Sequence, residues 1–457
     1  MKKLFSVLLI VFAVFGLCAC SNKQADEDAV TMLVRLGSGE AYYTQLAEDL
    51  ENELGITVKF VYENSTDPTD QIKLDFKNNN LQADIIFSNS KVDDEYLKDS
   101  CVDLLSETNI TEAFTYNKVS GCTTDDGAVY QLPFSSKLIG ITYNATLMEE
   151  MGWEVPKTFD DMLDLKAKCD EAGIPFSVSD FRETGHGFNY LFHIMGSEWL
   201  STLEGTTWLE NYLAGNATID EFKSHCEYFA KWVDNDLFGE VNLEAGWGAT
   251  TQFAKTRALF CFAILNNSDG YQGPMYDADG NETGVTLNDV HKTMPWISED
   301  GSNNCFTYYD NGWVMVNKAL LADDQAEKFE KVKQILEYMT GEKCSELTKS
   351  LSKDVYLALK NFEFSDDRLY SEYADDINNG YIQPWYYNEF DANTIVNTGA
   401  EVDSYCISNM YSADEVQTLS KDCNYTFDFD VTFDKIFEVL DENHQNLLNA
   451  TVDSSLK

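Results

Sequence analysis

Short apolar runs near the start of the chain predict three strands separated by two helices. The runs at 30–36, 56–62 and 83–87 are rich in β-branched and aromatic residues, as buried strands are. Between them, the segments 40–54 and 71–79 place apolar residues at helical spacing. Strand, helix, strand, helix, strand in this order predicts a parallel sheet and the α/β fold class.

The stretch 127–144 follows, and the organisation of the whole chain depends on it. Two apolar runs of extended character, 129–132 and 138–143, are separated by Pro133 and two small serines. This pattern predicts a strand that leaves one sheet and enters another, which is how a hinge between two bodies is built. A bent strand inside one large α/β domain would produce the same residues, so the pattern leaves both arrangements open.

Further elements follow this stretch with clear boundaries. A helix at 147–153 ends at a glycine, and the next helix begins after Thr158, a good N-cap, and ends at Ala172 before another strand. The segment 361–407 is rich in Tyr, Asp and Asn and gives no clear pattern. Helical spacing returns in 427–448.

The first residues are a processing signal. Lys2 and Lys3 precede an apolar core at 4–17, which is too short to span a membrane. Leu17 and Ala19 before Cys20 resemble the lipobox of bacterial lipoproteins, which implies removal of residues 1–19 and a lipid on the Cys20 sulfur. Residues 20–29 would then be a tether. A plain secretory signal without lipid is the alternative. No later run of 18 apolar residues exists, so we expect membrane attachment through the lipid only.

The net charge and the cysteine content argue against some classes of ligand and against a zinc site. A net charge of −46 argues against nucleic acid as a partner and disfavours polyanionic solutes. Of 11 cysteines, Cys18 would be removed and Cys20 lipidated, which leaves an odd number and at least one free thiol. Cys101 and Cys122 flank a loop-rich segment and are either bridged or free. No Cys-x-x-Cys pair occurs, so a zinc site is not expected.

Motifs of enzymes and of metal or nucleotide sites are incomplete. The sequence has no His-Glu-x-x-His and no Gly-x-Ser-x-Gly, and none of its 78 acidic residues lies in a distinctive motif. The glycines at 37 and 39 do not complete a dinucleotide fingerprint, because Tyr42 replaces the third glycine. Residues 277–281 imitate the start of a calcium loop, but a hairpin turn fits them better. We therefore expect no enzymatic activity, cofactor or metal.

Several motifs occur in the order found in one family. They are Asp-Gly-x-Val-Tyr-x-Leu-Pro-Phe at 126–134, Gly-Ile-x-Tyr-Asn at 140–144, Gly-Trp-Glu-Val-Pro-Lys-Thr-Phe-Asp-Asp at 152–161, Ala-Gly-Ile-Pro at 172–175, Phe-Ala-Lys-Thr-Arg-Ala-Leu-Phe at 253–260 and, at 311–318, Asn-Gly-Trp-Val-Met-Val-Asn-Lys. Together they resemble the extracellular solute-binding proteins of carbohydrate ABC importers, family 1, which are akin to maltose-binding protein. Thr256 departs from the family's usual glycine. The resemblance covers roughly residues 30–345 and fades beyond them.

The resemblance implies a two-lobed fold of the type II periplasmic binding proteins. Each lobe would be a mixed sheet flanked by helices, with the ligand cleft between the lobes. The N-terminal lobe would comprise 30–133 and 297–345, and the C-terminal lobe 137–293 and 346–457. The chain would cross between them at 133–137 and 291–297.

The resemblance also implies the function. We expect an exported monomer, anchored to the outer face of the bacterial cytoplasmic membrane, that captures a sugar or oligosaccharide and delivers it to the permease of an ABC transporter. The alternatives are a receptor of the same fold for a peptide, polyamine or anion, and a surface lipoprotein that degrades or adheres to glycans.

Candidate ligand-binding residues combine hydrogen-bonding groups for sugar hydroxyls with aromatic rings for the apolar faces of the sugar. They lie in loops after strands, at the first crossing, and beside the returning strand. The predicted set is Gly37, Ser38, Glu40, Tyr42, Ser88, Asn89, Phe134, Ser135, Ser136, Arg182, Glu183, His186, Trp247, Asn266, Asn267, Asp310, Trp313 and Trp385.

Overall fold

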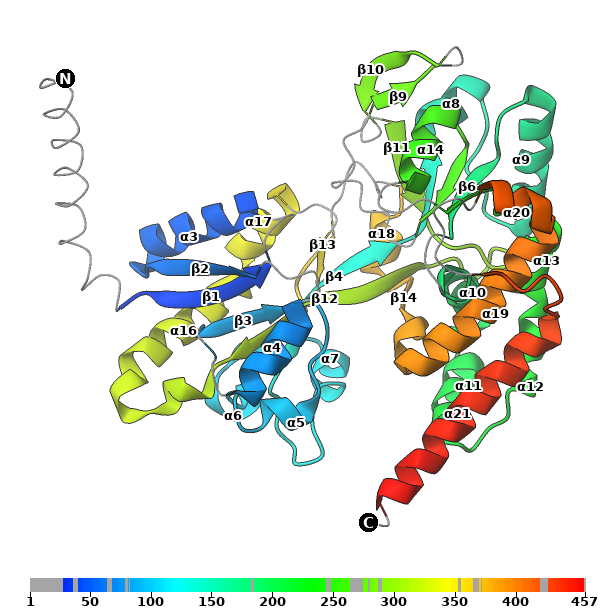
Figure 1. The fold of residues 1–457 in the computed structure, drawn as a ribbon. Helices are drawn as coiled ribbons and strands as arrows, with labels where there is room; N and C mark the ends of the chain where they lie inside the picture. Colours follow the sequence, from blue (N-terminus) through cyan, green and yellow to red (C-terminus); the bar gives the residue numbers. More distant parts are fainter. Residues whose placement is uncertain are drawn as a thin grey trace, which may run out of the picture. The chain divides into compact units, whose positions relative to one another are not determined.

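The computed structural model describes most of the chain and divides it into two units. The described residues are 28–35, 40–63, 68–78, 81, 83–181, 185–243, 248–263, 274–277, 280–286, 290–351, 355–364, 370, 372–419 and 426–455. Unit 1 comprises the chain up to Lys137 and Asp310–Phe364, and unit 2 comprises Leu138–Tyr309 and the chain from Ser365 onward. Figure 1 shows the elements of both units along the chain.

The sheet of unit 1 has the order β13-β4-β12-β3-β1-β2. As the sequence predicts, β1 pairs in parallel with β2 and with β3. β12 runs antiparallel to β3, and Trp313 lies opposite Ser88. The strands are β1 (Val30–Arg35), β2 (Val58–Glu63), β3 (Ile85–Ser88), β4 (Leu132–Ile139), β12 (Phe306–Val316) and β13 (Val355–Leu357).

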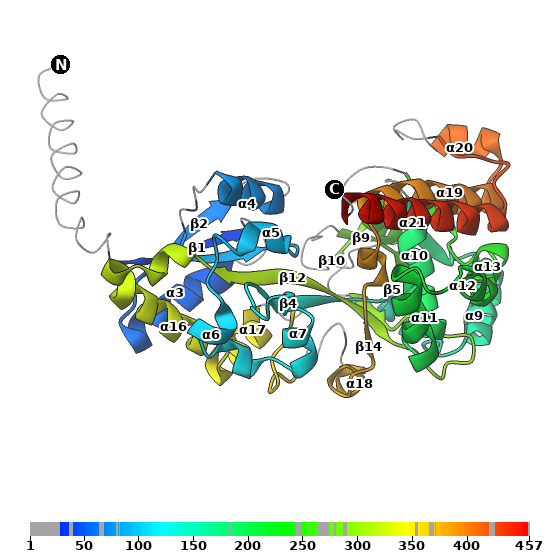
Figure 2. The same cartoon turned by 90° about the horizontal axis from the view of Figure 1, so that it is seen from below.

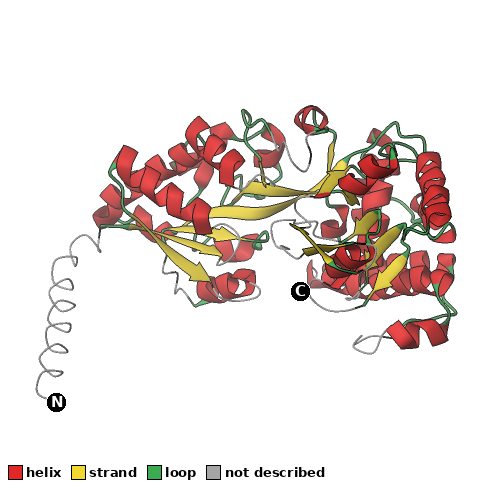
Figure 3. Cartoon of the chain, turned by 90° about the horizontal axis from the view of Figure 1, so that it is seen from above, coloured by secondary structure: helices red, strands yellow, loops and turns green. Residues whose placement is uncertain are grey.

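Helices flank this sheet, as the colouring in Figure 3 shows. Apolar side chains from β1, β3 and the helix Pro68–Lys77 meet in one core of unit 1, together with Met315 of β12. The helices are α3 (Glu40–Leu54), α4 (Pro68–Lys77), α5 (Asp94–Leu97), α6 (Leu104–Glu107), α7 (Tyr116–Ser120), α16 (Ala326–Met339) and α17 (Glu342–Leu351), with 3₁₀ turns at Ile110–Ala113, Lys318–Leu321 and Asp323–Gln325.

Unit 2 is built on a second mixed sheet, of order β11-β5-β8-β6-β7. Its parallel part is β6 with β7 and β8, and β5 and β11 continue it antiparallel. β9 and β10 pair antiparallel, and the Asp277 N–H donates to the Asn281 carbonyl oxygen between them, as in the predicted hairpin, whereas residues 278–279 lie outside the described residues. β14 pairs with residues 306–308 of β12. The strands are β5 (Ile141–Asn144), β6 (Ser177–Asp180), β7 (Glu240–Asn242), β8 (Phe260–Phe262), β9 (Pro274–Tyr276), β10 (Glu282–Thr286), β11 (His291–Met294) and β14 (Ile382–Pro384).

Some helices of unit 2 begin and end at residues whose local chemistry fixes them. Thr158 and Asp161 form a capping box at the start of α9, and Gly173 ends the helix with φ of +67°. α19 and α21 lie side by side in Figures 1 and 2. The helices are α8 (Ala145–Met151), α9 (Phe159–Ala172), α10 (His186–Met195), α11 (Leu203–Leu213), α12 (Asp220–His225), α13 (Glu227–Asp234), α14 (Gly248–Thr256), α18 (Ala374–Asn378), α19 (Ala392–Met410), α20 (Ala413–Leu419) and α21 (Phe433–Ser455), with a π-helical turn at Gly196–Leu200 and a 3₁₀ turn at Tyr386–Glu389.

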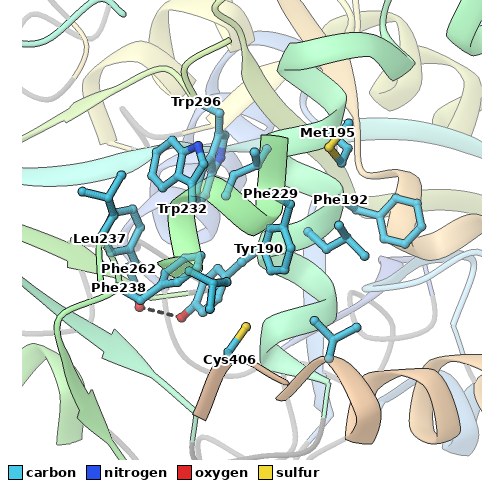
Figure 4. Close-up of a cluster of buried hydrophobic side chains, with 14 of the residues drawn as sticks. Tyr190, Phe192, Met195, Phe229, Trp232, Leu237, Phe238, Phe262, Trp296 and Cys406 are labelled. Carbon is cyan, nitrogen blue, oxygen red and sulfur yellow. Dashed lines mark hydrogen bonds between the residues drawn. The ribbon is translucent and has the colours of Figure 1, made fainter. Parts of the chain in front are cut away.

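An aromatic core holds α10 and α19 against the sheet of unit 2 (Figure 4). The rings of Tyr190 and Phe238 are stacked with centroids 5.3 Å apart, and Cys406 of α19 is buried in the same cluster. The Tyr190 hydroxyl donates to the carbonyl oxygen of Phe262 at 2.6 Å. Because a buried hydroxyl is costly without a partner, this bond lets a tyrosine occupy the core. The unpatterned segment 361–407 thus contributes a core helix.

The two compact units and the expected lobes divide the chain at different places, and the lobe assignment itself stays a prediction. Unit 1 ends at Lys137, inside β4, at the end of the crossing expected at 133–137. The second expected crossing, 291–297, lies inside unit 2, because β11 pairs with β5 there. The chain passes instead from unit 2 to unit 1 after Tyr309, within β12, and returns after Phe364. Residues 297–309 therefore belong to unit 2 and residues 346–364 to unit 1.

The strands around Pro133 differ from the prediction, and the structure shows whether Cys101 and Cys122 are bridged. Of the run predicted at 129–132, only Leu132 belongs to a strand, and β4 includes Pro133 as its second residue. The run predicted at 138–143 is divided between the end of β4 and β5. Cys101 and Cys122 are buried and are not joined in a disulfide. The signal 1–19 and Cys20 lie outside the described residues. Among the helices that the structure describes, none is both long and apolar enough to cross a membrane.

Candidate functional site

Three partly exposed aromatic side chains of unit 2 lie together, and we call Tyr309, Trp385 and Tyr387 the aromatic platform. The ring of Trp385 stacks on that of Tyr387, with centroids 5.4 Å apart and planes 19° apart. Tyr309 meets Trp385 edge-on at 5.3 Å. All three are only half-buried. Preformed aromatic surface of this kind can stack against an apolar ligand face.

Hydrogen bonds fix the platform to the first turns of α10. The indole Nε1–H of Trp385 donates to Oδ1 of Asn189 at 2.8 Å, and Nδ2–H of Asn189 donates to the carbonyl oxygen of Gly185 at 3.1 Å. The Tyr387 hydroxyl lies 3.7 Å from where a Cβ atom on Gly185 would stand. The orientation of the platform therefore depends on the start of α10.

His193 supports the platform from the interior. Its ring is nearly parallel to the indoles of Trp296 and Trp385, at centroid distances of 4.8 and 6.1 Å. Nδ1 is hydrogen-bonded to the Thr307 hydroxyl at 2.9 Å, whereas Nε2 has no partner among the described residues. Burial lowers the pKa of His193 to about 3, so the ring is neutral under ordinary conditions.

A buried group of ionisable residues stands at the same end of α10. The Nδ1–H of His186 donates to the carbonyl oxygen of Asp180 at 2.9 Å, and the Asp180 carboxylate is 3.4 Å away. Burial lowers the pKa of His186, but the hydrogen bond to Asp180 and the charges of Asp180 and Asp403 outweigh it, so the net pKa is raised. Burial raises the pKa of Asp403 to about 7, against hydrogen bonds from Gly185 and Gly187. Such shifted groups often mark functional sites.

Unit 1 holds a second polar cluster, formed by Lys118, Ser136 and Asp310. The ammonium of Lys118 lies 2.9 and 3.0 Å from the two oxygens of the Asp310 carboxylate. The Ser136 hydroxyl donates to Oδ1 of Asp310 at 2.5 Å. The side chains of the ion pair are 19% and 18% exposed. The carboxylate is therefore oriented by α7 and β4 and can still accept a bond from a ligand hydroxyl.

Of the predicted ligand-binding residues, Ser136, Asp310 and Trp313 lie together in unit 1. In unit 2, Trp385 is hydrogen-bonded to Asn189 of α10, whereas His186, the first residue of that helix, faces Asp180. The indole Nε1–H of Trp313 donates to the carbonyl oxygen of Asp310 at 3.3 Å. Ser135 lies beside Ser136 in β4 and pairs with Leu357. Whether these residues contact a ligand stays a prediction.

Other predicted residues have neighbours that indicate a packing role. Tyr42 is buried against α17, where its hydroxyl is hydrogen-bonded to Sγ of Cys344 at 3.1 Å. Phe134 is buried edge-on against Phe87, with centroids 6.0 Å apart. The Ser88 hydroxyl donates to the carbonyl oxygen of Ser90 at the end of β3, and Asn89 follows it.

The remaining predicted residues lie outside what the structure describes. Glu40 is the first residue of α3, but its side chain is not described. The residues wholly outside the described ranges are Gly37, Ser38, Arg182, Glu183, Trp247, Asn266 and Asn267. Their role in binding remains a prediction.

Sequence reasoning missed several residues that build the two clusters. Tyr309 is one position from the predicted Asp310, and Tyr387 is two positions from the predicted Trp385. The available signal was the number of tyrosines around these two predicted residues. Lys118, Asn189 and Asp403 carried no local signal, because their partners are remote in sequence. Among the described residues, no group of three or more His, Cys, Asp or Glu side chains could hold a metal ion.

Comparisons with known proteins agree on the fold. RafE from Streptococcus pneumoniae has a TM-score of 0.61 at 15% identity, over 91% of this chain and 97% of that one, and RafE in complex with raffinose has 0.58 at 15%, over 91% and 98%. A family 1 extracellular solute-binding protein from Bifidobacterium longum subsp. infantis has 0.59 at 12%, over 92% and 99%. A sugar transporter protein from Bacillus licheniformis in complex with stachyose has 0.53 at 15%, over 91% and 99%. These similarities confirm the two-lobed, mixed α/β fold.

Sequence comparison gives the family. No curated protein sequence matches the chain. The family profile described as bacterial extracellular solute-binding protein matches residues 45–343, which is more than half of the sequence. The chain therefore belongs to the family of bacterial extracellular solute-binding proteins.

Proposed function

We propose that this solute-binding protein captures a neutral sugar or oligosaccharide and delivers it to the permease of an ABC transporter. The aromatic platform carries the proposal. A sugar ring has apolar C–H faces, and a stacked pair of aromatic rings such as Trp385 and Tyr387 offers a flat, preformed surface for one of them. Polar side chains among the predicted ligand-binding residues would then distinguish one arrangement of hydroxyls from another.

Two further observations support a neutral sugar. Structures with the same fold contain raffinose and stachyose, although identities of 15% extend only to the fold. The net charge of −46 disfavours polyanionic ligands. The family and its structural neighbours are binding proteins, and the proposed role needs no catalytic group.

The rest of the proposal concerns unit 1 and the membrane. The Asp310 carboxylate, held by Lys118 and Ser136, would accept a hydrogen bond from a sugar hydroxyl. The other predicted ligand-binding residues are part of the same proposal. We further propose that the protein acts as a monomer outside the cytoplasmic membrane and is anchored by a lipid on Cys20.

A ligand panel with a platform variant tests the function. Raffinose, stachyose, chitin oligosaccharides, peptides, polyamines and anions are each added to the purified protein, and the unfolding midpoint is measured. A sugar that binds raises the midpoint by mass action. Trp385→Ala should weaken that sugar's affinity, measured by titration calorimetry, by about 1–2 kcal/mol, or roughly tenfold, because a stacking surface is lost.

The control is Tyr381→Ala, which removes a more exposed aromatic ring four residues before Trp385. This variant should bind as the unchanged protein does. A peptide, polyamine or anion as the only stabilising class would overturn the sugar proposal. Turnover of a fluorogenic glycoside that one carboxylate substitution abolishes would show an enzyme instead.

A further inference from the structure

Asp403 is a fully buried acidic residue in α19, a helix for which the sequence predicts no functional role. Its two carboxylate oxygens accept one backbone hydrogen bond each, from the N–H groups of Gly185 and Gly187, both at 2.6 Å. These residues form the start of α10. Short bonds from backbone N–H groups to an ionised carboxylate are stronger than neutral hydrogen bonds.

Glycines allow the two helices to approach this closely. A Cβ atom on Gly399 of α19 would lie 2.6 Å from the Cα of Gly185, and one on Gly187 would lie 2.8 Å from Oδ1 of Asp403. Gly185 also has φ of +97°, which L side chains rarely adopt. The contact between α19 and the first turn of α10 thus needs these residue types.

The same turn orients the aromatic platform. Gly185 accepts a hydrogen bond from Asn189, Asn189 accepts one from the indole of Trp385, and the Tyr387 hydroxyl lies beside Gly185. A shift of this turn would therefore move both stacked rings.

We propose that Asp403 is a positioning residue for sugar binding, because its carboxylate holds the turn of α10 to which the rings of Trp385 and Tyr387 are attached. The proposal rests on the proposed function, and it assigns Asp403 an indirect role without contact to the ligand.

The arrangement requires the ionised carboxylate. Protonation would turn one oxygen into a donor facing a backbone N–H group, and one of the two bonds would be lost. The titratable groups that act on Asp403 and its surroundings are His186 and Tyr190 of α10, Asp180 of β6 and Cys406 of α19. Burial raises the pKa of Asp403 to about 7, so this carboxyl changes its charge near neutral pH. Sugar affinity should consequently fall as the pH falls below neutrality.

The first measurement needs no ligand. In a ¹H–¹⁵N spectrum of the protein, the indole N–H signal of Trp385, assigned with Trp385→Phe, should shift with pH with a midpoint near neutrality. In Asp403→Asn the signal should stand at the acidic position and stay there at every pH. Glu401→Gln, a change of the same kind on the same helix, should leave the titration as it is.

The second measurement is affinity. Raffinose, or the sugar that the panel identifies, is titrated between pH 5.5 and 8.5. The unchanged protein and Glu401→Gln should lose about tenfold in affinity toward the acidic end, the loss expected when one charge-assisted hydrogen bond breaks. Asp403→Asn should bind about tenfold more weakly at pH 8 and show a flat profile.

The two proposals fail in different ways. A folded Asp403→Asn with an unchanged Trp385 signal, or with the affinity and pH profile of the unchanged protein, overturns the positioning role while sugar binding stands. If no sugar binds at all, the proposed function fails, whereas the indole titration still decides whether Asp403 positions the ring. If Asp403→Asn does not fold, the titration of the unchanged protein decides, and a pH-independent indole signal contradicts the proposal.

Discussion

Two buried ionisable side chains, His193 in α10 and Asp403 packed against the start of α10, have pKa values shifted toward their neutral forms. Burial lowers the pKa of His193 to about 3 and raises the pKa of Asp403 to about 7, and in each case the neutral form is favoured. The consequences for stability have opposite signs, because one group is a base and the other an acid. Taken alone, the raised pKa of Asp403 lowers the free energy of unfolding as the pH rises from about 4 to about 7.

His193 gives a prediction at the residue scale. The pKa of His193 is lower in the folded state than in the unfolded state. Its contribution to the free energy of unfolding is therefore present above pH 6.5 and is lost as the pH falls toward 3. The total over that window is up to about 5 kcal/mol. In His193→Phe, the free energy of unfolding should fall less steeply over this window, as measured by denaturant titration at successive pH values.

A second histidine of α10 provides the control for this prediction. His186, with its raised pKa, should titrate above the ordinary value of histidine in an NMR pH series, while the ring signals of His193 stay constant down to pH 4. A His193 ring that titrates near 6.5 would show that it is exposed to water, contrary to its buried position.

At the scale of elements, the ion pair of Lys118 and Asp310 attaches the short helix α7 to β12, and Ser136 adds β4. A five-residue helix such as α7 has little stability of its own, since few intrahelical bonds form. Its position should therefore depend on this contact. Asp310 of this cluster is also the residue at which the chain enters unit 1 again.

A double-mutant cycle tests this contact. Lys118→Met or Asp310→Asn alone should lower the free energy of unfolding by about 1–3 kcal/mol, because each removes the oppositely charged partner of a largely buried side chain. The double variant should lose less than the sum of the two, which chemical denaturation measures. Strict additivity of the single changes would show that the pair contributes nothing.

An exposed pair provides the comparison. Lys98 and Asp126 are in contact at 2.6 Å, but their side chains are 63% and 41% exposed. Removing Lys98 as Lys98→Met should leave the unfolding free energy unchanged within error, because solvent screens exposed pairs.

At the scale of the molecule, the proposed lipid determines where the protein works. Cys20→Ala removes the sulfur that would carry it, so this variant should appear in the soluble fraction of cells, whereas the unchanged protein should be found with the membrane. Metabolic labelling with a fatty-acid analogue, followed by fractionation, measures both.

Cys18→Ala is the matched control, since the lipobox resemblance places the modification on Cys20. This variant should remain labelled and membrane-bound. Labelling that persists in Cys20→Ala would place the lipid on another residue.

Local sequence patterns determined much of the fold. The apolar runs gave the parallel strands β1, β2 and β3, and Thr158 and Gly173 gave the ends of α9, because strand periodicity and capping depend on neighbours in the chain. Ordered motifs gave the family. Residue chemistry also gave Trp385 and Asp310 as site candidates, because aromatic rings and carboxylates near strand ends are the groups that sugars need.

Only the tertiary structure decided which distant residues complete the two clusters. Asp403 meets Gly185 across 218 positions, and Lys118 meets Asp310 across 192. The placement of residues 291–294 in unit 2 likewise depends on the pairing of β11 with β5. Periodicity fixes which residues form an element and which face is apolar. It carries no information on which element lies opposite, since that is set by packing and hydrogen bonding once the chain has folded.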